Sequence, residues 1–371
     1  MTLPLEVTRR KSRPIQIGPV TVGGDAPISV QSMTNTPTAD VTATVAQIKR
    51  LEAAGCEIIR VAVPDEAAAE AIARIKSQIT IPLVADIHFD HRLAIRAARA
   101  GADALRLNPG NIGGMAEIRA VVDCAKDHGL SIRVGVNAGS LEKDLLARHG
   151  GVTPEAMVAS AIRHVELLRS MDFEAVKVSI KASDVPRTVT AYRLLAARTD
   201  LPLHIGVTEA GALYTGIVKS ALGIGMLLAE GIGDTLRVSL TRDPVEEVRV
   251  GFEILKALGI RRRGPDLIAC PTCGRTQIDL FDIVEKVEAR INTLALPIKI
   301  AIMGCVVNGP GEAREADIGV AGGKGVGILF KKGEIVRKFP ESELVDVLLA
   351  EIDRYAAEAL SSDRTVPGRD D

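Results

Sequence analysis

Aromatic residues are scarce in this chain: Trp is absent, and Phe, Tyr and Trp together make up 2% of 371 residues. Proteins that bind single-stranded nucleic acid use aromatic side chains as stacking platforms, so that class is disfavoured. The formal net charge of −1 also argues against a dedicated nucleic-acid or membrane-surface binder. Because 47% of the residues are apolar, we expect a large core built from Ala, Val, Ile and Leu.

Long apolar runs and a disulfide framework are missing as well. No uninterrupted apolar run approaches the roughly 20 residues that cross a bilayer, and no basic segment followed by an apolar one opens the chain. Five cysteines are too few, and odd in number, for a disulfide framework. We therefore expect a cytoplasmic protein in a reducing compartment.

Short β-branched runs alternate with Ala-rich segments of helical period from about residue 28 to 258. The expected strands are 28–34, 58–63, 83–87, 104–108, 131–136, 175–180, 203–207 and 235–240. Eight such units have the size of a closed (β/α)8 TIM barrel. A doubly wound sheet is the alternative, but no glycine-rich fingerprint follows the first strand.

The domain limits follow from changes in composition. We expect residues 9–24 to form a hairpin that plugs the barrel, and the polar turn 261–265 to end the barrel domain. The sequence thus predicts a substrate-binding barrel over 1–262, a smaller α+β domain over 263–360 and a polar tail over 361–371. The glycine-rich segment 322–327 lacks a Ser or Thr after its lysine, which favours a turn between strands over a phosphate loop.

Cations interrupt several apolar strands. They are Arg60, Arg106, Arg133, Lys177, Lys181 and Arg237. Alternate residues of a barrel strand face the lumen, so apolar neighbours that face the helices turn these cations inward. Unpaired buried charges are costly, and each of these cations therefore needs an anion.

Two sources of anions are open. Asp86, Glu209 and Asp103 could form an internal salt-bridge network, or a small substrate with several negative charges could bind at the carboxyl end of the strands. The lumen holds more cations than carboxylates, which favours a phosphate or diphosphate. Polar residues at strand ends, including Asn137 and Ser239, agree with that choice, whereas Asp86 and His88 receive no assigned role.

Three cysteines predict a metal or redox site in the smaller domain: Cys270 and Cys273 in a CxxC pair, and Cys305. Structural zinc lacks an obvious fourth ligand, because every histidine lies at or before His204. A redox dithiol would leave Cys305 unexplained. Three thiolates suit a [4Fe–4S] cluster with one iron open to a weaker ligand. Glu312, seven residues after Cys305, is either that ligand or a surface carboxylate.

Four segments together resemble the bacterial 4-hydroxy-3-methylbut-2-enyl diphosphate synthases of the methylerythritol phosphate route to isoprenoids. They are CPTCGRT (270–276), MGCVVNGPGE (303–312), SMTNT (32–36) and ADIHFD (85–90). The resemblance covers essentially the whole chain. It implies a TIM barrel followed by an iron–sulfur domain similar to those of sulfite and nitrite reductases, without the additional domain of plant-type members.

The resemblance also implies roles for individual residues. Cys270, Cys273, Cys305 and Glu312 match the cluster ligands of the family. The diphosphate-binding positions correspond to Arg60, Arg106, Arg133, Asn137, Lys181 and Ser239. Glu209 falls where the family keeps an acidic residue near the reacting carbons. The strand pattern adds Lys177 and Arg237 to the predicted substrate-binding set.

The implied reaction is the two-electron reductive ring opening of 2-C-methyl-D-erythritol 2,4-cyclodiphosphate to (E)-4-hydroxy-3-methylbut-2-enyl diphosphate, with loss of a hydroxyl as water. Flavodoxin or ferredoxin would supply the electrons. We expect Glu312 to give way to a substrate oxygen at the unique iron, and Glu209 to be a candidate proton donor. The rival functions are a sugar-phosphate or pterin-type transferase with a zinc-stabilised accessory domain, and a scaffold with a zinc-ribbon module.

The linker length bears on assembly. The last barrel helix ends near the bottom of the barrel, whereas active sites lie at the top. Residues 261–266 span about 20 Å at most, roughly the length of one barrel helix. We therefore expect a head-to-tail homodimer in which a second chain supplies the cluster, as the resemblance also implies.

Overall fold

A computed structural model describes residues 7–291, 294–305 and 313–363. The chain divides into two units between Arg261 and Arg262, and separate hydrophobic cores lie on either side of that point. Within the described ranges, no helix combines the length and apolar character needed to cross a membrane.

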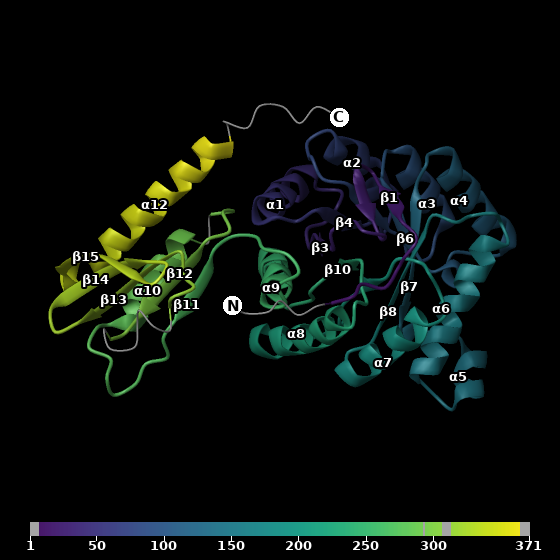
Figure 1. Cartoon of the computed structure of the whole chain (residues 1–371). Helices are drawn as coiled ribbons and strands as arrows, with labels where there is room; N and C mark the ends of the chain where they lie inside the picture. The colour runs from purple at the N-terminus through teal and green to yellow at the C-terminus, as the bar shows by residue number, and fades with distance from the viewer. Residues whose placement is uncertain (1–6, 292–293, 306–312, 364–371) are drawn as a thin grey trace. The chain divides into compact units, whose positions relative to one another are not determined.

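The first unit is the predicted (β/α)8 barrel (Figure 1). Its eight strands pair in the order β8-β7-β6-β5-β4-β3-β10-β9, all parallel. A bridge from Val178 to Leu203 joins the two outer strands and closes the sheet. The strands are β3 (Ser29–Met33), β4 (Ile58–Ala62), β5 (Leu83–Asp86), β6 (Ala104–Leu107), β7 (Ser131–Asn137), β8 (Val176–Lys181), β9 (His204–Ile205) and β10 (Thr235–Leu236).

Helices follow the strands and form the outer ring of the barrel (Figure 1). They are α1 (Val41–Ala54), α2 (Glu66–Lys76), α3 (His91–Arg99), α4 (Met115–Asp127), α6 (Pro154–Arg169), α7 (Val185–Ala196), α8 (Leu213–Ala229) and α9 (Pro244–Ala257), with the short α5 (Lys143–His149) after β7. Asp40, Asp65, Asp90, Asp184 and Asp243 cap five of them by accepting backbone N–H bonds. These caps begin the helices soon after the strands end and keep the loops at the carboxyl end short.

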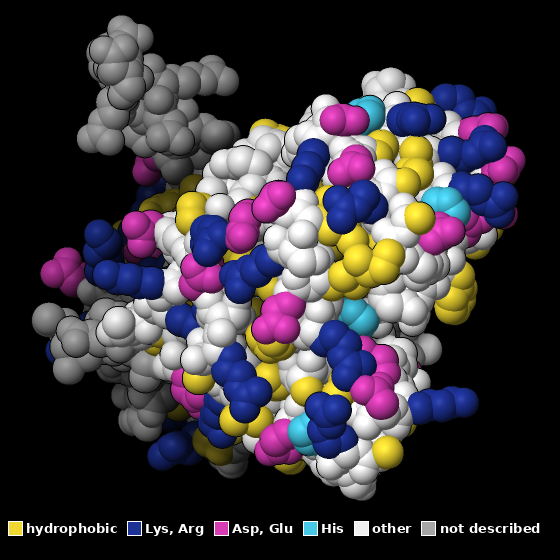
Figure 2. Space-filling view, turned by 90° about the vertical axis from the view of Figure 1, so that its right-hand side faces the viewer, with side chains coloured by type: hydrophobic (Ala, Val, Ile, Leu, Met, Phe, Trp, Pro, Cys, Tyr) yellow, Lys and Arg dark blue, Asp and Glu magenta, His cyan; other side chains and the backbone are white. Residues whose placement is uncertain are grey.

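The outer surface carries both signs of charge. Figure 2 shows one face of the molecule, on which Lys and Arg side chains are interspersed with Asp and Glu. Ion pairs on the barrel helices follow the same pattern, such as Arg96 with Glu66 at 3.0 Å and Arg163 with Asp144 at 2.6 Å. The visible face therefore offers no basic patch of the kind that binds nucleic acid.

The second unit is a five-stranded mixed sheet in the order β11-β12-β13-β14-β15. Its strands are β11 (Asp266–Ala269), β12 (Lys299–Met303), β13 (Ile318–Gly323), β14 (Val326–Lys331) and β15 (Glu334–Pro340), and its helices are α10 (Leu280–Ile291) and α12 (Leu344–Asp363). The predicted turn at 322–327 is confirmed, with Lys324 and Gly325 at positive φ between β13 and β14. The strands predicted from the sequence did not include β11, a four-residue edge strand directly after the linker.

The end of α12 differs from the expected start of the polar tail. The helix continues to Asp363, past the limit expected at residue 360. Ser and Asp are weak helix formers, but no Gly or Pro stops the helix before position 367. The rest of the predicted tail, 364–371, lies outside the described residues.

An amino-terminal hairpin closes one end of the barrel, as expected. Strands β1 (Ile15–Ile17) and β2 (Val20–Val22) pair antiparallel. Ile17 and Val22 are fully buried against Ile58, Val84 and Ala104, at or near the starts of their strands. The hairpin therefore fills the amino-terminal end, and the carboxyl end is left for a site.

Asp234 connects this amino-terminal segment to the barrel. Its buried carboxylate accepts hydrogen bonds from Ser12 Oγ at 2.7 Å, Leu203 N at 2.8 Å and Arg9 Nη2 at 3.2 Å. Asp234→Asn should lower the free energy of unfolding by about 2 kcal/mol, because it removes the buried counter-charge of two partly buried arginines, Arg9 and Arg10. Urea unfolding followed by circular dichroism measures this.

The matched control is Asp200→Asn. Asp200 also pairs with an arginine of the amino-terminal segment, Arg13 at 3.0 Å, but both side chains are exposed. Exposed pairs contribute less than about 1 kcal/mol. Equal losses in the two variants would show that Asp234 does not hold the plug.

Candidate active site

A polar cavity of about 250 Å³ lies in the barrel lumen at the carboxyl ends of the strands. Its lining residues are Met33, Arg60, Asp86, His88, Arg106, Arg133, Asn137, Ser179, Lys181, Val207, Thr208 and Arg237. Of the six cations that the sequence predicts in the lumen, all but Lys177 are in this set. The strand register explains the gathering, since Asp86, Arg106 and Arg133 lie side by side on β5, β6 and β7.

Asp86 is the one carboxylate among the lining residues of this cavity. It pairs with Arg106 at 2.9 Å and with Arg60 at 3.5 Å, and His88 Nε2 lies 3.7 Å away. Burial alone would raise the pKa of Asp86, but Arg60, Arg106 and Arg133 outweigh burial and lower it. Asp86 is therefore an anion that orients two of the arginines. The internal salt-bridge network that the sequence left open therefore forms only in part. Asp86 pairs with lumen arginines, but Asp103 pairs with Lys76 and not with a lumen cation.

Arg133 and Lys181 lie in the same lumen without a carboxylate partner in the described part of the chain. Arg133 is buried, and its Nε and Nη1 atoms have no hydrogen-bond partner. Burial, followed by repulsion from other cations, lowers the pKa of Lys181 and that of Arg133 well below their usual ranges. An incoming polyanion would relieve both effects, so the cavity is suited to a ligand with several negative charges.

Arg237 has a partner that the sequence analysis missed. Glu247 on α9 is buried, and it accepts bonds from Arg237 Nε at 3.1 Å and Nη2 at 3.0 Å. Arg237 also donates to Ser239 Oγ at 3.1 Å. The helical period of the sequence contains a signal for this pair, because Glu247 lies on the same helix face as Val248 and Gly251, which are buried. A carboxylate on the core face of a barrel helix indicates a cation inside the barrel.

Three predicted site residues, Lys177, Ser239 and Glu209, do not line the cavity. Lys177 is buried four residues before Lys181 on β8, and its Nζ has no hydrogen-bond partner. Glu209 is exposed and follows Thr208, which does line the cavity. Its φ of 51° lies in the left-handed region, a strained backbone often found at functional sites. Their substrate-binding and catalytic roles stay predictions.

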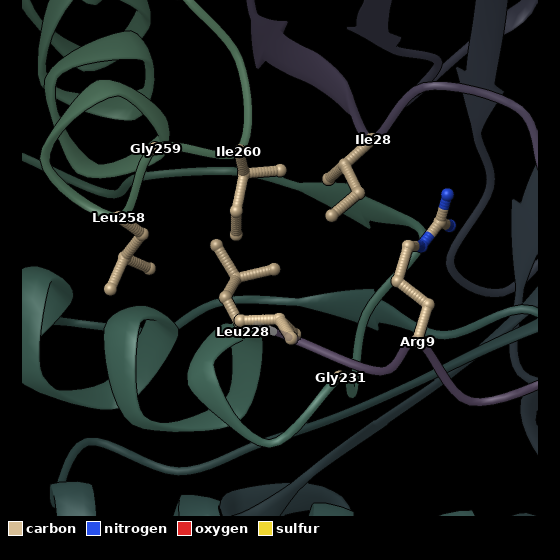
Figure 3. A pocket seen from close by; sticks show the side chains of 8 residues that line it. Arg9, Ile28, Leu228, Gly231, Leu258, Gly259 and Ile260 are labelled. Atoms are coloured by element: carbon tan, nitrogen blue, oxygen red, sulfur yellow. The ribbon is translucent and has the colours of Figure 1, made fainter. Parts of the chain in front are cut away.

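A second cavity of about 230 Å³ lies in the first unit near the ends of α8 and α9. Figure 3 shows that aliphatic side chains surround it, among them Ile28, Leu228 and Ile260. The guanidinium of Arg9 is engaged by Ala26 O at 2.6 Å and by Asp234 at 3.2 Å. This lining offers no group of residues suited to acid–base or anion chemistry, so the polar cavity is the candidate site.

The cysteines of the second unit follow two neighbouring parallel strands. Cys270 comes directly after β11 and donates its N–H to Ile302 O of β12 at 3.0 Å, and Cys305 comes two residues after β12. Thr276 lies between Cys273 and the Cys305 loop. Its Oγ1 accepts the Cys273 N–H at 3.0 Å, and a Cβ on Gly304 would lie 3.0 Å from its Cγ2. The topology thus brings the CxxC loop beside Cys305.

The chemistry of these thiols suits a soft metal centre. Cys273 is exposed, and hydrogen bonds from the backbone and side chain of Arg275 lower its pKa. By contrast, burial raises the pKa of Cys56 to about 12. Across residues 7–291, 294–305 and 313–363, no group of three His, Cys, Asp or Glu residues is placed to hold a metal. Glu312, the predicted fourth ligand, lies outside the described residues.

These features define a class: (β/α)8-barrel proteins with a cation-rich lumen and an appended sheet domain that carries three cysteines. Residues 12–252 match the GcpE TIM-barrel domain and residues 266–354 the GcpE protein C-terminal domain. The chain belongs to the GcpE family. This result confirms the resemblance seen in the motifs and the barrel that it implied.

Curated relatives match nearly the whole chain. A protein of Geobacter sulfurreducens named 4-hydroxy-3-methylbut-2-en-1-yl diphosphate synthase (flavodoxin) is 59% identical over 94% of this chain and 99% of its own. A protein of the same name from Azotobacter vinelandii is 58% identical over 97% of both chains. Among solved structures, Yersinia pestis dihydropteroate synthase shows a distant likeness, with 13% identity and a TM-score of 0.47 over 66% of this chain and 98% of that one.

The charge of Asp86 predicts a pH-dependent stability difference. Its pKa is lowered in the folded protein, so its contribution is present above the unfolded value near pH 4 and is lost as pH falls through the folded pKa. Asp86→Asn should therefore cost about 3 kcal/mol of unfolding free energy near pH 7. The difference from wild type should shrink below about pH 4. Urea unfolding at several pH values measures it.

Asp65→Asn is the control for that comparison. Asp65 caps α2 by accepting the Ala68 N–H at 2.9 Å, and asparagine caps a helix equally well. We expect little change at either pH. A difference for Asp86→Asn that stays constant from pH 7 to pH 3 would contradict an ionised Asp86 in the folded state.

Proposed function

We propose that this chain catalyses the reductive ring opening of 2-C-methyl-D-erythritol 2,4-cyclodiphosphate to (E)-4-hydroxy-3-methylbut-2-enyl diphosphate. The C–O bond that closes the ring to phosphate breaks, a hydroxyl leaves as water, and two electrons and a proton are taken up. The single observation that carries the proposal is the surplus of cations over carboxylates in the cavity. The names of the curated relatives support it.

The arginines and Lys181 hold the diphosphate. Arg60 and Arg106 are oriented by Asp86, and Arg237 is oriented by Glu247. Fixed guanidinium groups bind phosphate oxygens in pairs and lose little conformational freedom on binding. Asn137, the last residue of β7, adds a neutral hydrogen-bonding group, and Ser239 accepts a bond from Arg237. Lys177 lies four residues before Lys181 on β8, where burial, followed by repulsion from Arg133 and Arg60, lowers its pKa well below the usual range. A bound polyanion would favour its charged form.

Glu209 is the candidate proton donor of the proposal. It lies on the loop after β9, and Thr208, the residue before it, donates its N–H to Ala182 O at 3.2 Å. That bond fixes the loop to the end of β8, beside Lys181. An exposed carboxyl group next to a cavity-lining residue can exchange protons with solvent between turnovers.

Cys270, Cys273 and Cys305 would hold a [4Fe–4S] cluster, with Glu312 as the weaker fourth ligand. Three thiols of one domain fit the soft donors that iron–sulfur clusters use. When bound, the cluster supplies the electrons of the reduction. Flavodoxin, which appears in the names of the curated relatives, is the proposed donor, with ferredoxin as the alternative.

The decisive experiment compares Cys305→Ser with Cys124→Ser. Anaerobically purified wild type should be brown and carry about four iron and four sulfide per chain. Cys305→Ser should lose most of both and at least about 100-fold in activity, because an Fe–S ligand is removed. Iron and sulfide assays and turnover with reduced flavodoxin measure these effects.

Cys124→Ser is the matched control, because Cys124 is buried in the barrel far along the sequence from the other thiols. It should keep both the cluster and the activity. Zinc in place of iron, together with full activity without a reductant, would overturn the proposal and favour a transferase with a zinc-stabilised domain.

We also propose that the active site is completed by a second copy of the chain. The side chain of Arg261, the last residue of the first unit, donates to Ile28 O at 2.5 Å and pairs with Glu57 at 2.7 Å. Ile28 and Glu57 directly precede β3 and β4, so the chain leaves the barrel at its amino-terminal end. The residues from 262 to 265 span only about 14 Å when extended. That length supports donation of the cysteines to a partner barrel.

Paired variants test this sharing. Lys181→Met damages the cavity and Cys305→Ser damages the cluster site, so each homodimer should be almost inactive. A heterodimer isolated by two different tags keeps one intact barrel facing one intact cysteine set. It should show about half the wild-type activity if the site is shared across a two-fold dimer.

A site built within one chain gives the opposite outcome. Each chain of the heterodimer then carries one defect, and the heterodimer should be as inactive as the homodimers. Iron content of the isolated heterodimer, expected at half the wild-type value, checks that both chains are present and folded.

A further inference from the structure

Two loops at the carboxyl end of the barrel follow neighbouring strands that carry cavity residues. The loop after β6 begins with the 3-10 turn η1 (Pro109–Asn111), and the loop after β7 begins with the 3-10 turn η2 (Ala138–Ser140). Arg106 on β6 and Asn137 at the end of β7 both line the polar cavity. The position of each loop therefore bears on a side chain of the candidate site.

Hydrogen bonds fix each turn to the strand before it. Asn108, the residue after β6, accepts the Gly110 N–H on its Oδ1 at 3.2 Å, and its side chain is buried. In the other loop Ser140 Oγ donates to Asn137 O at 3.2 Å. A displacement of either turn is therefore transmitted to the end of its strand and to the cavity residue there.

His164 of α6 contacts both loops from the helix ring. It is only 3% exposed, and its Nε2 lies 3.2 Å from Oε1 of Glu142, which follows η2. In the other loop, a Cβ on Gly110 would come within 2.8 Å of His164 Cε1. The φ of Gly110 is not in the left-handed region, so the nearness of the imidazole, and not the backbone angle, excludes a side chain there.

His164 and Glu142, which we call the inner pair, have only each other within the described chain. Neither His164 Nε2 nor either carboxylate oxygen of Glu142 has another hydrogen-bond partner there. Burial is the largest effect on the pKa of His164 and lowers it, so the ring is neutral near pH 7. A neutral ring with its hydrogen on Nε2 can donate to a carboxylate at 3.2 Å. Separating the loop from α6 would leave two buried polar groups unpaired.

A second pair joins the same elements at the surface. Arg163 of α6 pairs with Asp144 of α5 at 2.6 Å, and both side chains are exposed. We call these residues the outer pair. An exposed ion pair contributes little because solvent screens it. The inner and outer pairs therefore connect α6 to the same segment of chain but differ in burial, which makes the outer pair a matched control.

We propose that His164 is a positioning residue of the active site, whose ring holds the loops after β6 and β7 so that Arg106 and Asn137 keep their binding orientations. His164 is not among the residues that line the cavity, so it acts on the ligand through the two loops. Groups that are already oriented lose less freedom on binding. The proposal rests on the proposed function for its substrate, the cyclodiphosphate, and adds a residue that determines how tightly this substrate binds.

His164→Leu tests this role in the anaerobically purified holoenzyme with reduced flavodoxin. Leucine keeps an apolar side chain at the position but cannot donate to Glu142. The KM for the cyclodiphosphate should rise about 10-fold, with kcat changed less than about 2-fold, because binding is weakened and the chemistry is not. Calorimetric titration with inorganic diphosphate should show a similar rise in Kd, about 10-fold. His164→Gln has a side-chain amide that can donate in place of Nε2 and should restore both constants to within about 2-fold of wild type.

Gly110→Ala disturbs the same contact from the other loop. Its added methyl group meets His164 Cε1 at 2.8 Å, so it should push the ring and the loop apart and raise KM and Kd about as much as His164→Leu. The double variant should be little worse than either single one, because both changes disrupt one contact and such effects are not additive.

Asp144→Asn is the control, since it removes the charge of the outer pair and should leave KM and Kd unchanged. Far-ultraviolet circular dichroism checks that every variant is folded. Unchanged KM and Kd in His164→Leu and Gly110→Ala, with only a smaller fraction of active enzyme, would show a purely structural role and overturn the proposal. Wild type that binds diphosphate but does not turn over the cyclodiphosphate would overturn the proposed function, and the diphosphate Kd would still decide the role of His164.

Discussion

The excess of buried positive charge in the barrel lumen is the constraint on which the rest of the structure depends. Arg60 and Arg106 share Asp86, and Arg237 has Glu247, but Arg133 and Lys181 have no carboxylate partner among the described residues. Burying unpaired cations lowers the stability of the folded barrel when no anion is bound. It becomes favourable when a doubly charged ligand enters, so the cost of folding these cations inward is recovered in binding.

The carboxylates have a different task from the cations. Asp86 and Glu247 do not neutralise the lumen; they hold particular guanidinium groups in fixed orientations. Side chains that are already fixed lose little conformational entropy when a ligand binds, so each charged contact contributes more to the binding free energy. Glu247 shows that this support comes from the helix ring as well as from the strands, since it reaches Arg237 from α9.

The two units divide the chemistry between them. In the proposed reaction the barrel binds and orients the substrate, and the second unit contributes thiols at the ends of a parallel strand pair, where Cys270 and Cys305 follow β11 and β12. Arg261 fixes the exit of the chain at the amino-terminal end of the barrel.

Periodicity and motif spacing in the sequence alone determined the barrel, its eight strands and the inward cations, because alternation along a strand is a local property. They also determined the CxxC and Cys305 set. Only the tertiary structure decided which charges meet. In the structure Asp103 pairs with Lys76, and Glu247 is the carboxylate that pairs with a lumen cation, Arg237. Lys177 lies outside the cavity lining, and Glu209 is exposed. Those outcomes depend on register between strands distant in sequence and on which face of a helix packs inward, which no local pattern encodes.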